Sequence, residues 1–232
     1  MAHLPPAPAR VLELGAGSGW QSSLLVACGY EVTAVDVCPP SEGSLVRVLP
    51  IDGVLLPFAT GSFDVAFSSN VLEHVVDLPV LLGEVDRVLR PSGRSVHLIP
   101  TPTWRVLTMV TFYVSLPSRA FRHIKARRSR DASAGPAGER LPARTVLHKV
   151  GSMLWESPHG EFSAAAAEIW AYRAAAWRRR LCGHVVAEEP AGVVYTGYGI
   201  FPKLSLRSRR LAARLLGSAC RIYVVKPARE VG

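Results

Sequence analysis

A short apolar run followed by three closely spaced glycines constrains this chain more than any other feature. Residues 11–14 predict a buried strand, Gly15, Gly17 and Gly19 a tight turn, and residues 20–28 the helix that follows. Such a strand, turn and helix bring bare backbone and a helix N-terminus to the carboxyl edge of a parallel sheet. The stretch therefore predicts an α/β fold that binds a nucleotide-like ligand at this edge.

The glycine spacing separates two kinds of nucleotide site. A dinucleotide fingerprint, G-x-G-x-x-G, needs glycine where this chain has Trp20, and no Tyr-x-x-x-Lys pair follows the fifth predicted strand. With Glu13 ahead of the turn, the spacing E-x-G-x-G-x-G resembles motif I of the class I S-adenosylmethionine (SAM) methyltransferases. The resemblance implies that Glu13 lies near the amino-acid end of the cofactor. It also implies that backbone approaches the methionine moiety at Gly15, Ala16, Gly17 and Gly19.

The next two predicted strands, residues 31–37 and 45–51, each end beside an acidic residue. Asp36 closes the first, where a carboxylate can accept both ribose hydroxyls of a nucleoside. Asp52 and Gly53 follow the second. The resemblance implies that Asp52 reaches the adenine amino group and that the backbone of Gly53 meets the ring.

The string from Asp52 to Val75 resembles the methyltransferase subfamily that includes the ubiquinone and menaquinone biosynthesis enzymes. Within it, Ser69 and Asn70 follow the fourth predicted strand and are expected to face the sulfonium and the substrate pocket. His74 is a candidate general base, although the Glu-His pair of this subfamily often caps a short helix.

The remaining pattern completes one domain over residues 1–232. We predict a helix over 78–89 that ends at the Arg-Pro-Ser-Gly break, and a fifth strand over 95–100 with His97 packed inside it. One Ala-rich helix over 163–181 and strands over 184–188 and 220–226 follow. The expected fold class is α/β: a Rossmann-like, seven-stranded, mostly parallel sheet with an antiparallel last strand, helices on both faces and a lid inserted after strand 5. The expected parts are a cofactor-binding half over 10–100, the lid over 101–163 and a C-terminal part over 164–232.

The two halves of the chain carry opposite charge. Residues 1–100 hold five Arg/Lys and ten Asp/Glu, whereas residues 101–232 hold 22 Arg/Lys and eight Asp/Glu. This asymmetry suggests that the second half meets an anionic partner. The apolar, aromatic residues 104–121 fit either an interfacial membrane anchor or a lid over the substrate. Residues 203–214, with leucines among Lys/Arg, fit either a membrane surface or a solvated amphipathic helix.

His159 is the second candidate catalytic residue, because it titrates near neutral pH and lies in a His-Gly-Glu cluster before the Ala-rich helix. The alternative interpretation is that Glu161 or Ser163 merely caps that helix.

Four scattered cysteines without a C-x-x-C pair favour reduced thiols and no metal site. No signal peptide or membrane span is visible, so we expect a cytoplasmic protein. Peripheral association with the cytoplasmic face of a membrane is the expectation if residues 104–121 or 203–214 are interfacial. The expected function is methyl transfer from S-adenosyl-L-methionine to a small or lipid-linked acceptor. The alternatives are a nucleic-acid methyltransferase, disfavoured because no N/D-P-P-Y/W motif is present, and a non-catalytic partner protein that keeps the fold. The methylated atom and the oligomeric state stay open.

Overall fold

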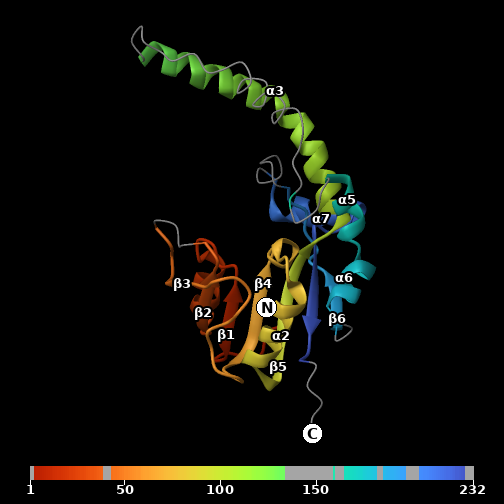
Figure 1. Cartoon of the computed structure of the whole chain (residues 1–232). Coiled ribbons are helices and arrows are strands. Elements are labelled where there is room, and N and C mark those ends of the chain that lie inside the picture. Colours follow the sequence, from red (N-terminus) through yellow and green to blue (C-terminus); the bar gives the residue numbers. More distant parts are fainter. Residues whose placement is uncertain are drawn as a thin grey trace.

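The chain forms one seven-stranded sheet in the order β3-β2-β1-β4-β5-β7-β6 (Figure 1). The computed structural model describes residues 3–38, 43–133, 159, 165–181, 185–196 and 204–227, and the side chains of 119–120 and 122–133 lie outside this description. The strands are β1 (Arg10–Leu14), β2 (Glu31–Asp36), β3 (Val48–Pro50), β4 (Phe63–Ser69), β5 (Leu89–Pro100), β6 (Val185–Pro190) and β7 (Cys220–Val225). β1 to β5 are parallel, and β7 runs antiparallel between β5 and β6.

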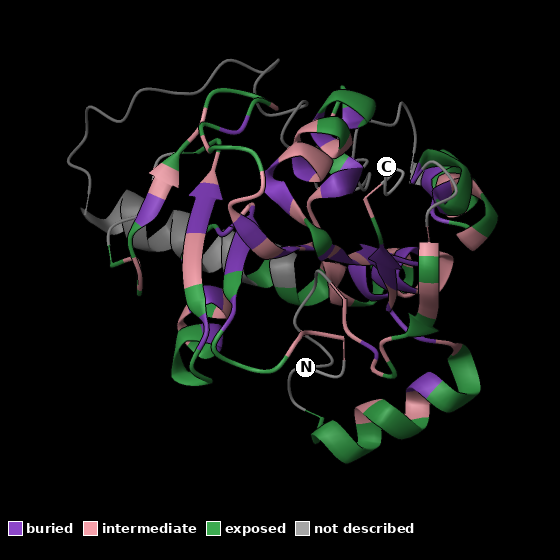
Figure 2. Cartoon of the chain, turned by 90° about the horizontal axis from the view of Figure 1, so that it is seen from below, coloured by how far each residue is buried: buried purple, intermediate pink, exposed green. Residues whose placement is uncertain are grey.

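The helices cover both faces of this sheet. They are α1 (Trp20–Ala27), the 3₁₀ turn η1 (Leu72–His74), α2 (Leu78–Val88), α3 (Pro102–Ser133), α5 (Ala165–Ala171), α6 (Ala174–Arg180) and α7 (Leu206–Leu216). Because successive strand residues point to opposite faces, Leu12 packs with Val85 of α2 and Trp177 of α6, whereas Val11 packs with Leu25 of α1. Figure 2 shows the buried residues gathered in the strands and the exposed ones on the outer helices.

This architecture confirms the predicted fold class, including the antiparallel last strand. Residues 39–44, between the second and third predicted strands, are too few and too Pro-rich for a full crossover helix and predict a reduced one, and they fall largely outside the description. β3 is shorter than the strand predicted over 45–51. Two further differences show how tertiary contacts override local pattern.

β5 begins six residues earlier than predicted, immediately after α2. Leu89 pairs with Phe63, but the next pair is Arg94 with Val65, so the Arg-Pro-Ser-Gly segment forms a bulge within the strand and is no helix-ending turn. A Cβ at Gly93 would lie 2.9 Å from the Arg90 carbonyl oxygen and 3.1 Å from that of Asp64. Only glycine permits this close approach, so Gly93 allows the strand to form the bulge.

The predicted single helix over 163–181 is two short helices, α5 and α6. Arg173 adopts an extended conformation with φ −65° and ψ 142°, which separates them. The break lets Tyr172 and Trp177 both lie buried, Tyr172 beside Trp104 and Trp177 in the core under the sheet. Two buried aromatic side chains outweigh the helix propensity of the alanines.

α3 leaves the carboxyl edge of β5 and projects far beyond the body of the molecule (Figure 1). No helix in the described part of the chain is both long and apolar enough to cross a membrane.

Candidate functional site

The glycine turn, residues 15–19, joins β1 to α1 at the carboxyl edge of the sheet. Gly15, Gly17 and Gly19 all have positive φ, at 67°, 53° and 73°, a conformation that other residues adopt only with strain. A Cβ would lie 2.4 Å from Val71 Cγ2 at Gly15 and 2.5 Å from Val46 Cγ2 at Gly19. A Cβ at Gly17 would meet nothing within 4 Å. The backbone of Gly17 therefore borders open space at this edge.

Glu13 lies buried in β1, 1% exposed, directly before the glycine turn. The hydroxyl of Ser22 on α1 donates to Glu13 Oε2, but Oε1 has no hydrogen-bond partner among the described residues. Burial raises the pKa of this carboxyl above its ordinary value. A buried acceptor oxygen without a protein donor is a position that a ligand's cationic or N–H group could satisfy.

Asp36 ends β2 beside the same turn. Its Oδ2 accepts a hydrogen bond from the Gly17 N–H at 2.7 Å, and its Oδ1 accepts one from the Cys38 N–H at 2.8 Å. These bonds fix the half-buried carboxylate at the turn, and each oxygen keeps a lone pair for a further donor. The structure thus brings together Glu13, the glycines and Asp36, as the motif predicts.

The other predicted cofactor residues lie at neighbouring strand ends. Asp52 and Gly53 follow β3 and are exposed, with Gly53 at φ 70°. Ser69 ends β4, Asn70 follows it, and both are half-buried. Asn70 adopts a positive φ of 54°, rare for a residue other than glycine, and its N–H donates to the Leu98 carbonyl oxygen at 2.9 Å.

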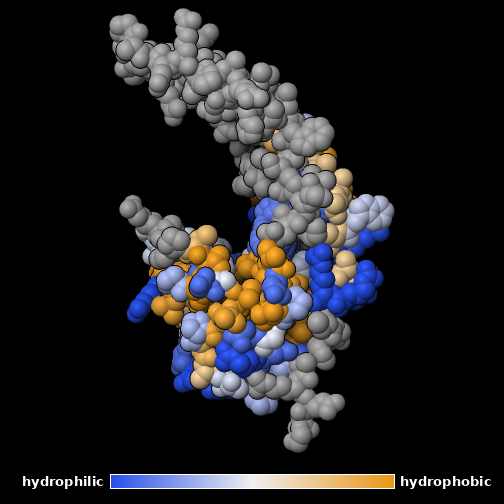
Figure 3. All heavy atoms as spheres, viewed as in Figure 1, coloured by the Kyte–Doolittle hydropathy of each residue, from blue (hydrophilic) through white to orange (hydrophobic). Residues whose placement is uncertain are grey.

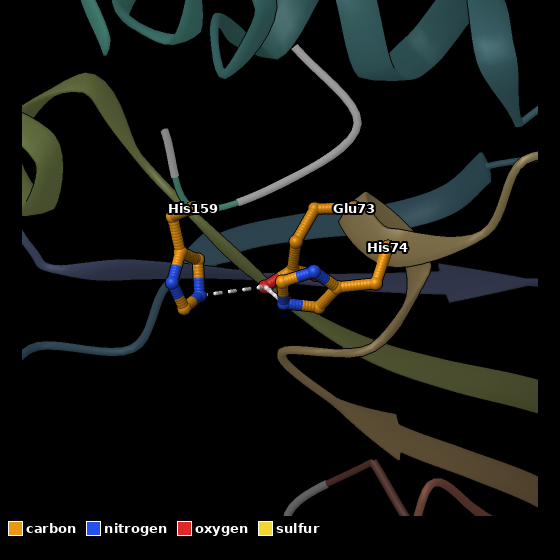
Figure 4. A group of neighbouring side chains, drawn as sticks. All are labelled: Glu73, His74 and His159. Carbon is orange, nitrogen blue, oxygen red and sulfur yellow. Dashed lines mark ion pairs between the residues drawn. The ribbon is translucent and has the colours of Figure 1, made fainter. Parts of the chain in front are cut away.

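Glu73, His74 and His159 form a compact group, here called the histidine cluster (Figure 4). Glu73 Oε1 lies 4.0 Å from Nε2 of each histidine, and the imidazole ring centroids are 4.7 Å apart. The Glu73 side chain is fully buried, whereas His74 and His159 are 42% and 39% exposed. The two predicted catalytic histidines, 85 residues apart in sequence, therefore meet in space over a buried carboxyl group.

Burial governs the protonation of this cluster. Removal from water, with a smaller contribution from the nearby Glu168 carboxylate, raises the pKa of Glu73 to about 8. Burial also lowers the pKa of His159, with His74 as the next cause. Neither side-chain oxygen of Glu73 has a hydrogen-bond partner on another described residue.

A buried ion pair holds His159 in place. Arg105 Nε of α3 lies 2.7 Å from Glu168 Oε2 of α5, with side-chain exposures of 1% and 0%. Glu168 Oε1 accepts the backbone N–H of His159, and the His159 ring lies 4.7 Å from that of Trp104. α3 and α5 therefore position His159 against η1.

A third polar group was not visible from the sequence. Tyr195 donates its hydroxyl to Asn70 Oδ1 at 3.2 Å and also contacts the thiol of Cys220, which lies 3.3 Å from the same oxygen. Burial raises the pKa of Cys220 to about 12, so this thiol is a neutral donor. Tyr195, Cys220, Arg105 and Glu168 lie beyond residue 100, where no motif marks them. Glu73 is part of the Glu-His pair, but the sequence pattern suggested a role for His74 alone.

His97 is confirmed as a packed residue of β5. It is fully buried, and its Nδ1 shares a hydrogen bond of 2.8 Å with the Ser68 hydroxyl of β4. Burial lowers its pKa to about 4, so the ring is neutral at pH 7.

Comparison with known proteins agrees with this geometry. Residues 12–97 match the family described as "Methyltransferase domain". Residues 12–97 form a class I, S-adenosylmethionine-dependent methyltransferase domain. The matched residues of this methyltransferase domain include the glycine turn, Asp36, Glu73 and His74, whereas His159 lies outside them.

Curated relatives of the methyltransferase domain act on several acceptors. A demethylmenaquinone methyltransferase of Thermus thermophilus is 37% identical over 112 residues, 43% of this chain and 51% of that protein. A ubiquinone biosynthesis O-methyltransferase of Xanthomonas oryzae pv. oryzae is 33% identical over 108 residues, 40% of this chain and 44% of that protein. The chain thus spans about half the length of these relatives.

One solved structure matches the fold over the whole chain. The complex between the Trm112 methyltransferase activator and a methyltransferase of Haloferax volcanii gives a TM-score of 0.55 at 14% identity, covering 100% of this chain and 87% of that one. At this identity the likeness concerns the fold alone.

The residues of the methyltransferase domain fit S-adenosylmethionine, the cofactor of its class. Open space at Gly17 leaves room for a ligand against backbone, and Glu13 Oε1 is a buried acceptor without a partner among the described residues. Asp36 is held at the turn with lone pairs to spare. The buried oxygen of Glu13 suits the amino group of the cofactor, and the carboxylate of Asp36 suits its ribose hydroxyls.

Proposed function

We propose that this chain transfers a methyl group from S-adenosylmethionine to a small or lipid-linked acceptor. The observation that carries the proposal is the contiguous edge formed by Glu13, the glycine turn and Asp36, with the histidine cluster at the neighbouring end of β4. When bound, the cofactor supplies a methyl group already activated by the positive charge on sulfur. The protein's part is then to align the acceptor and to exclude water.

On the cofactor side, Asp36 would accept the ribose hydroxyls and Glu13 would face the amino group. Asp52 and Gly53 would meet the adenine, and Ser69 and Asn70 would border the sulfonium end. The fixed carboxylate of Asp36 and the open space at Gly17 support this assignment.

On the acceptor side, His74 and His159 would assist the loss of the acceptor's proton. Their partial exposure beside a buried carboxyl group, at the end of β4, supports this role. Asn70, which Tyr195 and Cys220 hold in place, would lie between the cofactor and the acceptor.

A lipid-linked acceptor at an anionic membrane is the finer part of the proposal. α7 keeps Leu206, Leu211, Leu215 and Leu216 more than half exposed and carries four arginines among them. On α3, Val106, Val110 and Val114 are also exposed. An exposed apolar helix face with interleaved cations suits a membrane interface.

Leu55 before β4, Val76 before α2 and Val80 on α2 are further exposed apolar side chains. The face shown in Figure 3 carries an apolar patch over the body of the molecule. Its place beside the same sheet edge is compatible with an apolar acceptor.

Calorimetric titration with S-adenosylmethionine tests the proposal. We expect saturable binding by the parent chain and a loss of at least tenfold in affinity for Asp36→Ala. Glu31→Ala, at the opposite end of the same strand, is the matched control and should bind as the parent does. Equal binding by Asp36→Ala and the parent, or no binding by the parent at millimolar cofactor, contradicts the proposal.

A further inference from the structure

The histidine cluster has the composition of a metal site. We propose that Glu73, His74 and His159 bind one divalent transition-metal ion of the Zn²⁺ type, which holds a hydroxyl oxygen of the acceptor. Metal binding by these residues does not depend on the proposed function, whereas the role given to the ion does.

Three observations carry the proposal. The candidate ligand atoms, one from each residue, lie within 4.8 Å of one another. The Glu73 carboxyl group is fully buried, and its Oε1 lies equally close to the two Nε2 atoms. Neither of its oxygens has a hydrogen-bond partner on another described residue, although burying such a group without compensation is costly. A cation between the three side chains would remove that cost.

Metal binding requires the three ligand atoms to move closer together. Ligand bonds of about 2.1 Å in tetrahedral geometry place the ligand atoms roughly 3.4 Å apart. The present separation of 4.0 Å between Glu73 Oε1 and each Nε2 is slightly longer. The histidines are partly exposed, so their rings can rotate toward the ion, and Figure 4 shows both rings directed at the carboxyl oxygen.

The ligand set also selects the ion and its role. Two imidazoles and one carboxylate suit Zn²⁺ and similar ions, whereas Mg²⁺ prefers oxygen ligands alone. Three protein ligands leave a coordination position open, as in catalytic zinc sites. An acceptor hydroxyl bound there would have a lowered pKa and would release its proton to solvent past the exposed histidine edges. This arrangement favours oxygen over carbon as the methylated atom, and the histidines then act as ligands and not as free bases.

Metal titration of the chelator-treated chain tests the proposal. Because Cys28 and Cys38 are exposed thiols that could bind zinc, all titrations use a Cys28→Ser/Cys38→Ser background. Calorimetry with Zn²⁺ should give one site per chain, and with Mg²⁺ far weaker binding. Glu73→Gln and His159→Gln should each weaken Zn²⁺ binding at least tenfold. His3→Gln changes a histidine that pairs with Glu189 of β6 and belongs to no part of the histidine cluster, so it should leave binding unchanged.

The absorbance of the Co²⁺-loaded chain provides a second readout, since nitrogen and oxygen ligands give spectra distinct from thiolate. Circular dichroism checks that each variant folds. If Glu73→Gln does not fold, the His159→Gln variant serves as the test, because the His159 side chain is partly exposed. Absence of Zn²⁺ binding, or equal affinity in His159→Gln and the background, overturns the proposal. Asp36→Ala separates the two claims, because it should lose the cofactor and keep the metal.

Discussion

The glycine turn and the histidine cluster lie at the same sheet edge but are built in different ways. The turn uses backbone and two carboxylates within residues 13–36, a stretch that two neighbouring strands, the turn and one helix fix locally. The cluster joins η1 to His159, and its placement depends on α3 and α5 through a buried ion pair. A site made from local backbone leaves a sequence motif, whereas a site made by packing distant segments leaves almost none.

The sharpest way to separate the two regions is to break the ion pair. Arg105→Ala leaves Glu168 buried without its cation, which we expect to lower the free energy of unfolding by about 3–5 kcal/mol. In the fraction of the variant that remains folded, cofactor affinity should stay near that of the parent, whereas the contact of Glu168 with His159 should be weakened. Denaturant titration and calorimetry check this. A loss of cofactor affinity equal to that of Asp36→Ala would show that the two regions are not independent.

The buried His97 of β5 predicts how the stability of the sheet depends on pH. Its pKa falls from 6.5 to about 4 on folding, so the unfolded chain binds the proton more readily in that interval. The associated stability is therefore complete above about pH 6.5 and is lost as the pH falls toward 4, by about 3 kcal/mol in total. The free energy of unfolding, measured between pH 7 and 4, should fall more steeply with falling pH for the parent than for His97→Gln. Parallel curves would contradict the assignment.

Gly15 tests whether the turn depends on backbone alone. Gly15→Ala places a Cβ 2.4 Å from Val71 Cγ2 at a positive φ, and we expect a cost of about 2 kcal/mol together with weaker cofactor binding. Adding Val71→Ala should recover part of that stability, because it removes the steric clash but not the backbone strain. Gly17→Ala meets no atom within 4 Å, so it isolates the strain. If Gly15→Ala and Gly17→Ala cost the same, the contact with Val71 is irrelevant.

The same contrast explains what the sequence could predict. β1, the glycine turn, α1 and β2 follow from local pattern, and so does the packed position of His97. The early start of β5 could not be predicted, because the bulge at Gly93 depends on the backbone of Asp64 in the neighbouring strand. The break at Arg173 likewise follows from burial of Tyr172 and Trp177 against residues far along the chain. Glu73 lies within the string from Asp52 to Val75 that resembles the methyltransferase subfamily, yet its burial arises only from tertiary packing.

The smallest effect on stability is expected on α7, where the second half of the chain meets solvent. Leu211 and Leu215 are 58% and 79% exposed, so Leu211→Ser/Leu215→Ser should change the free energy of unfolding by less than about 0.5 kcal/mol. If these leucines insert into a membrane, the same change should abolish flotation with vesicles that contain phosphatidylserine. Val186→Ser, which changes an exposed residue of β6, is the control for loss of surface hydrophobicity. Flotation that is absent in the parent, or unchanged in the double variant, removes α7 from the membrane proposal. Because neither change touches the glycine turn, cofactor binding should be identical throughout, which keeps a failure of the membrane proposal separate from a failure of methyl transfer.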